Sequence, residues 1–312
     1  MSTTPLNRVR LAQTGRTGKP RRHDSPGDTA REALARPTAA RYTGRQAPPP
    51  IPREPDGDPV ALATPFLIVG AGRGGTTLLA ACLAAHPEIH VDMERFGTDV
   101  LMGLDGRSPC DGGLLADRAG RFRQACLAAA ADHPGLWGNK ITTEHILGLD
   151  QVNAVHLPYT DVAAYFFEHA VGDFPIVFIL RDGRACIPSK VARTGQPEAF
   201  AAHKWRFSVS AWRALTRVHA NAHVIRFEDL VRTPAACLRD VCAFLGRAFD
   251  PAMLAAPDST AMPADYRRAG FDPAALANGE IAAVTRRFIA DDLGELGYTR
   301  RGVRARLVRR RA

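Results

Sequence analysis

Apolar residues follow two patterns along the chain, short continuous runs and longer stretches with helical spacing. Phe66–Val69 and Phe174–Leu180 are mainly apolar runs of strand length. Such runs are typical of strands that are buried on both faces of a parallel sheet. Residues 222–227 are expected to form a third strand, and shorter extended segments are expected at 88–94 and 137–142.

Apolar residues with helical spacing lie between these strands and after them. They predict helices that begin at Thr76 and that cover about 114–131, 161–171, 184–193, 197–220, 234–245 and 279–296. Strands that alternate with helices predict a three-layer α/β/α fold around a central parallel sheet. Ligands of such folds bind at the carboxyl ends of the strands. Four charged residues lie at or just past these ends: Arg73, Lys140, Arg181 and Glu228.

A glycine-rich turn, residues 70–77 (Gly-Ala-Gly-Arg-Gly-Gly-Thr-Thr), connects the first strand to its helix. Glycines let backbone N–H groups converge, and the start of the helix adds its own N–H groups, so the turn should bind an anion such as phosphate. The glycine spacing formally fits both the dinucleotide fingerprint and the frame of a Walker A loop. Thr76 stands where a Walker lysine is required, which disfavours a kinase or ATPase.

A second candidate anion site follows the strand that ends at Leu180. It begins Arg181-Asp-Gly-Arg and continues to Ser189 and Arg193. These guanidinium and hydroxyl groups can surround a phosphate with charge-assisted hydrogen bonds, whereas the alternative is a set of surface ion pairs with Asp182. Two anion sites at one edge of a sheet imply a nucleoside ligand with phosphates at both ends.

Together these motifs resemble those of the sulfotransferases that use 3′-phosphoadenosine 5′-phosphosulfate (PAPS), with most similarity to the bacterial members and the tyrosylprotein sulfotransferases. The P-loop-like turn resembles their 5′-phosphosulfate loop, with glycine where the family has serine, and Arg181 to Ser189 resembles their 3′-phosphate motif. Phe227 stands where the family has a tyrosine. The resemblance implies that PAPS is held by Arg73, Gly74, Gly75, Thr76, Thr77, Arg181, Ser189, Arg193 and Phe227. Arg267 or Arg268 is a further candidate for the 3′-phosphate.

The resemblance also implies the catalytic residues. Glu94, which follows His86-Pro-Glu at the family's distance, would be the general base, and Lys140 of the Asn-Lys pair would face the sulfonate together with Arg73. These residue types suit sulfuryl transfer, which needs a base, cations near sulfur and stabilisation of the leaving phosphate. His86 and His90 are the alternative bases. No metal is expected.

Charge divides the chain into three parts. Residues 1–60 carry 11 Lys+Arg against 6 Asp+Glu, and residues 300–312 carry seven arginines and no acid, so the net charge of +9 leaves a body, 61–299, with a net charge of −3. We expect a disordered basic N-terminal segment, one sulfotransferase domain over 61–299 and an arginine-rich tail. The divided charge argues against a nucleic-acid partner.

The remaining features indicate a cytoplasmic protein whose acceptor is a hydroxyl group of a small molecule or glycan. The sequence has neither an apolar signal segment nor a run of 18 apolar residues, which predicts that no segment spans a membrane. The cysteines form no Cys-x-x-Cys pair and are expected to be buried thiols: Cys82, Cys110, Cys126, Cys186, Cys237 and Cys242. Homodimer formation is left open, and a non-catalytic nucleotide-binding regulator and a P-loop-type kinase remain the alternatives.

Overall fold

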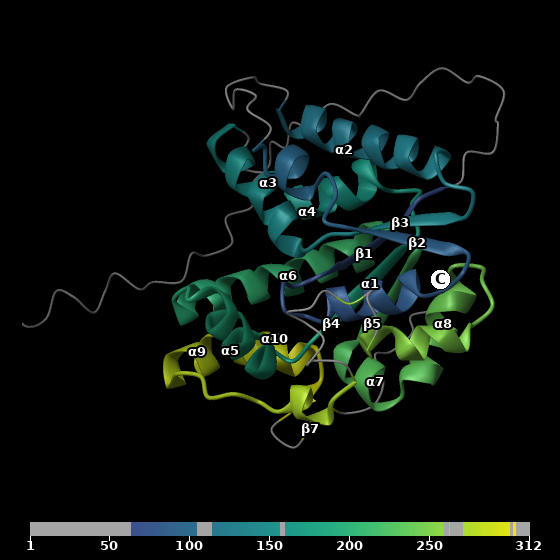
Figure 1. Ribbon diagram of the computed structural model, residues 1–312. Helices are drawn as coiled ribbons and strands as arrows, with labels where there is room; N and C mark the ends of the chain where they lie inside the picture. Colours follow the sequence, from purple (N-terminus) through teal and green to yellow (C-terminus); the bar gives the residue numbers. More distant parts are fainter. Residues whose placement is uncertain are drawn as a thin grey trace, which may run out of the picture. The chain divides into compact units, whose positions relative to one another are not determined.

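The computed structural model describes residues 64–104, 114–156, 160–258, 262, 271–299 and 302–303. Its central sheet has five parallel strands in the order β2-β3-β1-β4-β5 (Figure 1). The strands are β1 (Phe66–Gly70), β2 (Ile89–Met93), β3 (Leu136–Lys140), β4 (Ile176–Leu180) and β5 (Ala222–Arg226). The parallel α/β fold predicted from the sequence is therefore confirmed.

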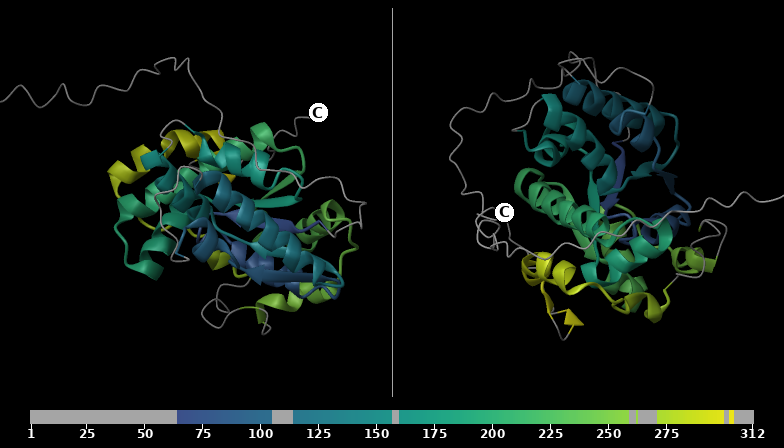
Figure 2. Two further views of the ribbon diagram at one scale, coloured as in Figure 1. Left: turned by 90° about the horizontal axis from the view of Figure 1, so that it is seen from above. Right: turned by 90° about the vertical axis from the view of Figure 1, so that its left-hand side faces the viewer.

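Helices cover both faces of this sheet (Figure 2). The α-helices are α1 (Thr76–Ala84), α2 (Leu114–Ala131), α3 (Thr143–His156), α4 (Val162–Tyr165), α5 (Gly183–Thr194), α6 (Glu198–Val218), α7 (Phe227–Arg232), α8 (Pro234–Phe244), α9 (Ala283–Phe288) and α10 (Ala290–Glu295). Shorter elements are the π-helical turns η1 (Gly97–Leu101) and η2 (Phe166–Ala170), the 3₁₀ turns η3 (Pro251–Asp258) and η5 (Pro273–Leu276), and the antiparallel pair β6 (Tyr298–Thr299) and β7 (Gly302–Val303).

Strand β1 shows why its sequence is apolar at every position. Leu67 and Val69 pack with α2, α3, α4 and α6, whereas Phe66 and Ile68 point to the opposite face and pack with α1, α7 and α8. All four side chains are fully buried. Each such side chain contributes roughly 1.5–3 kcal/mol of hydrophobic free energy, so β1 anchors both layers of helices.

The order of the strands also determines where a ligand can bind. From β1 the chain first builds the β3 and β2 side of the sheet and then crosses to β4 and β5 on the other side. One connection from the central strands runs towards the β3 and β2 side of the sheet and the other runs towards the β4 and β5 side. In parallel sheets a crevice forms between two such connections, at the carboxyl ends of the strands. The glycine-rich turn after β1 lies at this point.

The structure differs from the sequence-based prediction in several helices. Helix α3 was not predicted, because its residues mix polar and apolar side chains without a clear stripe. The helix expected over 279–296 is divided at the fully buried Ile289 into α9 and α10. The one expected over 161–171 starts as α4 and widens into η2. Phe227 begins α7 instead of ending β5.

The cysteine prediction is confirmed for the residues that the structure describes. Cys110 lies outside the described residues. The other five cysteines are buried free thiols: Cys82, Cys126, Cys186, Cys237 and Cys242. Burial raises the pKa of Cys82, Cys126 and Cys237 to about 12. These thiols are therefore neutral packing groups at physiological pH.

Glu228, expected at the edge of the sheet, is instead a buried structural residue. Its carboxylate accepts hydrogen bonds from the backbone N–H of Asp182 at 3.0 Å and from the hydroxyl of Tyr298 at 3.0 Å. Arg226 also donates a hydrogen bond to the carbonyl of Leu296. These contacts tie the segment after α10 to the carboxyl ends of β4 and β5.

Glu228 should make the stability of the protein depend on pH in a recognisable way. Burial raises the pKa of Glu228 above its ordinary value, despite the hydrogen bonds that favour the carboxylate. The raised pKa means that the contribution of Glu228 to the free energy of unfolding is largest below the ordinary glutamate pKa and is lost as the pH rises through the folded-state pKa. Glu228→Gln should abolish this loss, as measured by urea unfolding from about pH 4 to about pH 8.

The exposed Glu88→Gln serves as the matched control and should keep the pH profile of the parent chain. Tyr298→Phe removes one hydrogen bond to Glu228 and should lower the free energy of unfolding by about 1–3 kcal/mol. A Glu228→Gln variant with the pH profile of the parent would show that burial does not perturb this carboxyl group.

Candidate functional site

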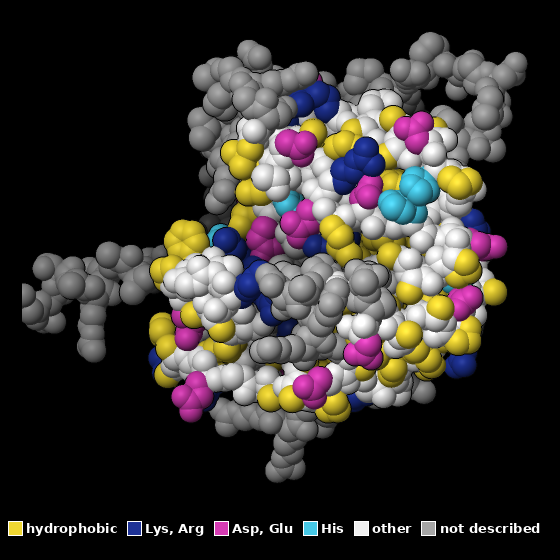
Figure 3. All heavy atoms as spheres, in the orientation of Figure 1, with side chains coloured by type: hydrophobic (Ala, Val, Ile, Leu, Met, Phe, Trp, Pro, Cys, Tyr) yellow, Lys and Arg dark blue, Asp and Glu magenta, His cyan; other side chains and the backbone are white. Residues whose placement is uncertain are grey.

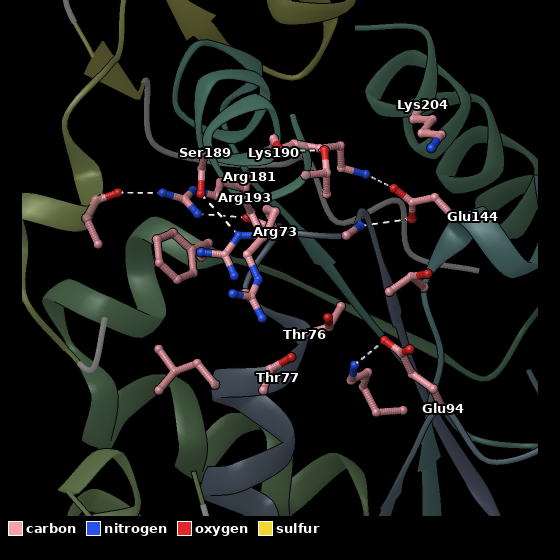
Figure 4. A pocket seen from close by; sticks show the side chains of 18 of the residues that line it. Arg73, Thr76, Thr77, Glu94, Glu144, Arg181, Ser189, Lys190, Arg193 and Lys204 are labelled. Atoms are coloured by element: carbon pink, nitrogen blue, oxygen red, sulfur yellow. Dashed lines mark hydrogen bonds and ion pairs between the residues drawn. The ribbon is translucent and has the colours of Figure 1, made fainter. Parts of the chain in front are cut away.

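A cavity of about 590 Å³ lies at the carboxyl ends of β1, β2, β3 and β4 (Figure 4). Its polar lining includes Arg73, Thr76, Thr77, Glu94, Lys140, Thr142, Glu144, Arg181, Ser189, Lys190, Arg193, Thr194, Gln196, Lys204 and Asp272. Figure 3 shows Lys and Arg side chains beside Asp and Glu side chains near the middle of this face of the molecule. Almost every residue predicted for the site therefore belongs to a single pocket.

The glycine-rich turn between β1 and α1 has the conformation of an anion-binding loop. The N–H of Gly74 donates to the carbonyl of Ala71 at 2.7 Å, and both Arg73 and Gly75 have positive φ, at 71° and 99°. A Cβ atom at Gly75 would lie 2.3 Å from the ring of Phe227, so a side chain is excluded there. Helix α1 begins at Thr76, and its first N–H groups have no partners within the helix.

Arg73 connects the two motifs that the sequence predicted as separate anion sites. Its Nε donates to Oγ of Ser189 at 3.2 Å, and its backbone carbonyl accepts a hydrogen bond from the guanidinium of Arg181 at 2.7 Å. The motifs are more than 100 residues apart in the sequence. Figure 4 shows Arg73, Arg181, Ser189 and Arg193 gathered on one side of the cavity.

Arg181 is held in place from several sides. Besides Arg73 it donates to the carbonyl of Ala275 at 2.6 Å, and its guanidinium carbon lies 4.2 Å from the ring centroid of Phe227. Burial lowers the pKa of Arg181, but guanidinium remains charged at any physiological pH. Arg181 therefore supports the conformation of the loop as well as presenting charge to the pocket.

The other arginines of the second motif have different positions. Arg184 pairs with Asp182 at 2.5 Å, and Asp182 also accepts a hydrogen bond from the backbone N–H of Arg184 as the N-cap of α5. Arg184 therefore forms an ion pair with Asp182, but this pair is largely buried and not on the surface. Arg193 is one turn beyond Ser189 on α5 and lines the cavity.

Glu94 and Lys140 meet because of the register between two strands. Met93 of β2 lies opposite Lys140 of β3, so the next residue, Glu94, reaches the same edge of the sheet. Nζ of Lys140 donates to Oε1 of Glu94 at 2.6 Å. Burial acts to raise the pKa of Glu94, but the charge and hydrogen bond of Lys140 outweigh it and hold the pKa below the ordinary value. The carboxyl group is therefore ionised at neutral pH.

The backbone around Glu94 is also specialised. Glu94 and Phe96 have φ values of 61° and 63°, and the side-chain amide of Asn139 donates to the carbonyl of Arg95 at 2.6 Å. Asn139 is fully buried. The Asn-Lys pair of the sequence thus has two structural roles, since Asn139 supports the turn after β2 and Lys140 pairs with Glu94.

The structure adds pocket residues that the sequence analysis missed, and they come from α3, α5 and α6. Glu144 accepts a hydrogen bond from the N–H of Gly72 at 2.9 Å and forms an ion pair with Lys190, while Lys204 donates to Gln196 at 3.0 Å. Burial, Lys204 and Arg73 lower the pKa of Lys190 to about 8, whereas the carboxylate of Glu144 favours the charged ammonium. Lys190 directly follows Ser189 in the second motif, and the scarcity of lysine in this chain was the sequence signal for Lys204.

The two histidines considered as alternative bases do not line the cavity. His86 is buried in a turn, where Nδ1 accepts from the N–H of Glu88 and Nε2 contacts the carbonyl of Ala248 at 2.9 Å. His90 is bound to Asp92 and its ring stacks on another histidine ring. Arg267 and Arg268 lie outside the described residues.

Comparison with known proteins identifies the family of this chain. The sequence matches the family model described as "Sulfotransferase family" over residues 65–251. The chain belongs to the sulfotransferase family. The matched range contains the residues that the sequence predicted for catalysis and for PAPS binding, except the further candidates Arg267 and Arg268. Among the residues that the structure describes, no helix is long and apolar enough to cross a membrane, and no group of three His, Cys, Asp or Glu side chains could hold a metal ion.

Individual sulfotransferases are similar to this chain at low identity. Protein-tyrosine sulfotransferase A of Caenorhabditis elegans is 23% identical over 205 residues, which cover 61% of this chain and 52% of that protein. The chain thus spans about half the length of this relative. The sulfotransferase domain of the Synechococcus PCC 7002 olefin synthase has a similar fold, with a TM-score of 0.50, 21% identity, and coverage of 77% of this chain and 98% of that domain. The sulfotransferase of Alicyclobacillus acidocaldarius gives a TM-score of 0.43 at 19% identity, covering 75% of this chain and 94% of that one.

The charges of Glu144 and Lys190 should contribute to the stability of this chain only when both are present. Both side chains are largely buried, so Lys190→Met leaves a carboxylate without its counter-ion beside the loop. We expect the free energy of unfolding to fall by about 2–4 kcal/mol, as measured by urea denaturation. The double variant Glu144→Gln/Lys190→Met should recover most of this loss because it removes both charges. The single variant Glu144→Gln completes the comparison. If the loss of unfolding free energy in the double variant equals the sum of the losses in the two single variants, the two side chains do not stabilise the fold as a pair.

Proposed function

We propose that this chain is a sulfotransferase that transfers a sulfonate group from PAPS to a hydroxyl group of a small molecule or glycan, with Glu94 as the general base. The proposal rests chiefly on one observation: the Glu94–Lys140 pair and the two arginine-containing motifs line the same pocket. A protein that only bound a nucleotide would need the arginines. It would have no use for a carboxylate and a lysine paired beside them.

The charge of the pocket supports an anionic donor. Six Lys and Arg side chains line its described part against three Asp and Glu side chains, although the body of the chain has a net charge of −3. We assign the 5′-phosphosulfate to Arg73 and to the turn of Gly74, Gly75, Thr76 and Thr77, and the 3′-phosphate to Arg181, Ser189 and Arg193. Phe227 would contact the nucleoside. The volume of the cavity is within the usual range for a ligand of this size.

Glu94 is placed to accept the proton of the acceptor hydroxyl. Its carboxyl group is ionised at neutral pH, and Lys140 donates a hydrogen bond to one of its oxygens. When bound, the donor supplies an activated sulfonate group attached to a phosphate leaving group. Lys140 can then turn from Glu94 towards the negative charge of this group, and a carboxylate without its ammonium partner is a stronger base. The same movement therefore activates Glu94 and stabilises the transferring group.

Arg73 and the start of α1 would stabilise the phosphate group that leaves in the reaction. The guanidinium of Arg73 is oriented by its hydrogen bond to Ser189. The guanidinium of Arg181 donates a hydrogen bond to the backbone carbonyl of Arg73 and so holds the loop. Fixed positive groups stabilise charge that develops in the transition state without having to reorganise. Backbone N–H groups at the helix start add donors for the phosphate. None of these functions requires a metal ligand.

The choice of nucleotide provides the first test of this function. Because the loop lacks the Walker lysine and a second arginine motif faces it, adenosine 3′,5′-bisphosphate should raise the melting temperature much more than ATP or NAD at equal concentration. Arg193→Gln should reduce this shift, whereas the exposed Arg217→Gln, which pairs with Asp161 away from the pocket, should not. Equal shifts with all three nucleotides would contradict the PAPS assignment.

Variants of the ion pair test catalysis separately from binding. Glu94→Gln keeps the shape of the side chain but removes the basic oxygen, so turnover should fall by roughly 10²–10⁴ while affinity for adenosine 3′,5′-bisphosphate persists. Lys140→Met should also act mainly on turnover, since its charge meets charge that grows in the transition state. The measurement is transfer of radiolabelled sulfonate from PAPS to a panel of phenols, saccharides and tyrosine peptides.

Glu88→Gln is the control for these variants because it changes an exposed carboxylate outside the pocket. Tyrosine peptides belong in the panel because the C. elegans relative is named for protein tyrosine. Transfer at the parent rate by both Glu94→Gln and Lys140→Met would exclude them as catalytic residues. Preference for the peptides would replace the small-molecule or glycan acceptor.

A further inference from the structure

A buried histidine on α3, His145, lies next to the carboxylate of Glu94. Its Nε2 is 3.9 Å from Oε2 of Glu94, the oxygen that Lys140 does not hold. The ring is 4% exposed. Its Nδ1 accepts a hydrogen bond from the backbone N–H of Thr142 at 3.0 Å. Since a backbone N–H can only donate, the proton of the neutral ring must reside on Nε2, facing Glu94.

The position of the ring is fixed by the chain segment that carries Glu94. A Cβ atom at Gly97 would lie 2.9–3.1 Å from three atoms of the His145 ring, so the ring packs against bare backbone at the start of η1. Glu94 and Phe96, in the turn leading to Gly97, have left-handed φ values. The histidine and the turn that presents the carboxylate therefore form one packed unit.

The electrostatic surroundings keep the ring neutral. Burial lowers the pKa of His145, although the negative charges of Glu94 and Asp99 act in the opposite direction and Lys140 reinforces the lowering. Among the residues that the structure describes, these three are the charged groups that act on the ring, from the end of β2, from η1 and from β3. A neutral ring with a proton on Nε2 can donate to a carboxylate but cannot remove a proton from it in this tautomer.

We propose that His145 is a positioning residue for Glu94: a small rotation of the Glu94 side chain closes the 3.9 Å separation, so that Nε2 donates a hydrogen bond to Oε2 and keeps Oε1 directed into the pocket when Lys140 releases it. This inference rests on the proposed function. In the reaction, the O–H bond of the acceptor breaks and its proton passes to Oε1 of Glu94. The acceptor oxygen forms the new bond to sulfur, and the bond between sulfur and the leaving phosphate oxygen breaks. His145 takes no part in the transfer of the proton.

An NMR titration tests the contact itself and requires neither donor nor acceptor. In protein labelled with ¹³C at the glutamate carboxyl carbons, Glu94 is assigned by the signal that Glu94→Gln removes. A donor on Oε2 stabilises the carboxylate, so His145→Phe should move the titration of Glu94 to higher pH. His145→Gln, whose amide can still donate, should move it less. An unchanged titration of Glu94 in His145→Phe would overturn the proposal.

Kinetics then test the consequence for catalysis. With the best acceptor of the panel, His145→Phe should lower kcat by roughly tenfold or more and move the acid limb of the pH profile to higher pH, with unchanged affinity for adenosine 3′,5′-bisphosphate. His145→Gln should recover part of kcat. The exposed His169→Gln is the control and should match the parent. Should His145→Phe fail to fold, His145→Gln and His145→Asn give the comparison, because the shorter amide should lose more activity.

The outcomes separate this inference from the proposed function. A parent chain that neither binds adenosine 3′,5′-bisphosphate nor transfers sulfonate would contradict the proposed function, while the titration would still report on the contact between His145 and Glu94. A parent chain that transfers sulfonate, with kcat and pH profile unchanged in His145→Phe, would overturn the role of His145 alone. If His145→Phe and His145→Gln lose the same amount of kcat and also lose affinity for the nucleotide, His145 stabilises the fold and does not position Glu94, and the proposal is wrong.

Discussion

The hydrogen bond from the Arg181 guanidinium to the carbonyl of Arg73 joins the two halves of the site. Arg73 is in a loop after β1 and Arg181 follows β4, and the parallel pairing of these strands brings the two residues to the same edge of the sheet. The contact fixes the backbone of the loop in a conformation with positive φ. The side chain of Arg73 then reaches Ser189. The geometry of the anion sites thus depends on the register of the central strands, which the buried apolar side chains of β1 and β4 hold in place.

Internal ion pairs balance opposite charges within the pocket. Glu94 pairs with Lys140, and Glu144 pairs with Lys190 and with the N–H of Gly72. Unpaired charges in a partly buried site would be costly to desolvate, and the pairs reduce this cost in the absence of ligands. An anionic ligand must compete with these carboxylates for the same cations. Part of the binding free energy is therefore spent on rearranging pairs, and this requirement favours ligands that carry several charges at suitable positions.

Much of the architecture could be predicted from the sequence because it depends on local patterns. The continuous apolar run of β4 predicts a buried parallel strand, which the structure has, and the glycine-rich sequence after β1 predicts a tight turn into a helix, which the structure also has. Residues on α3 could not be predicted in the same way. Glu144 and His145 belong to no motif, and α3 lacks an apolar stripe. The position of Glu144 in the pocket and of His145 next to Glu94 therefore depends on how α3 packs against α4, α6 and η1. Sequence likewise could not reveal that Glu228 is buried, since the hydroxyl that satisfies it comes from Tyr298, 70 residues later.

Arg73 and Glu94 share an unusual backbone conformation, with φ values of 71° and 61°. For residues with a Cβ atom this region costs roughly 1–2 kcal/mol, so the fold gives up stability at the two positions from which these side chains enter the pocket. Glycine or asparagine would relieve this strain while removing the charge. Selection for a more stable chain would therefore tend to erase these two side chains first. The chain therefore presents an arginine and a glutamate to the pocket at positions where its backbone would be more stable without a side chain.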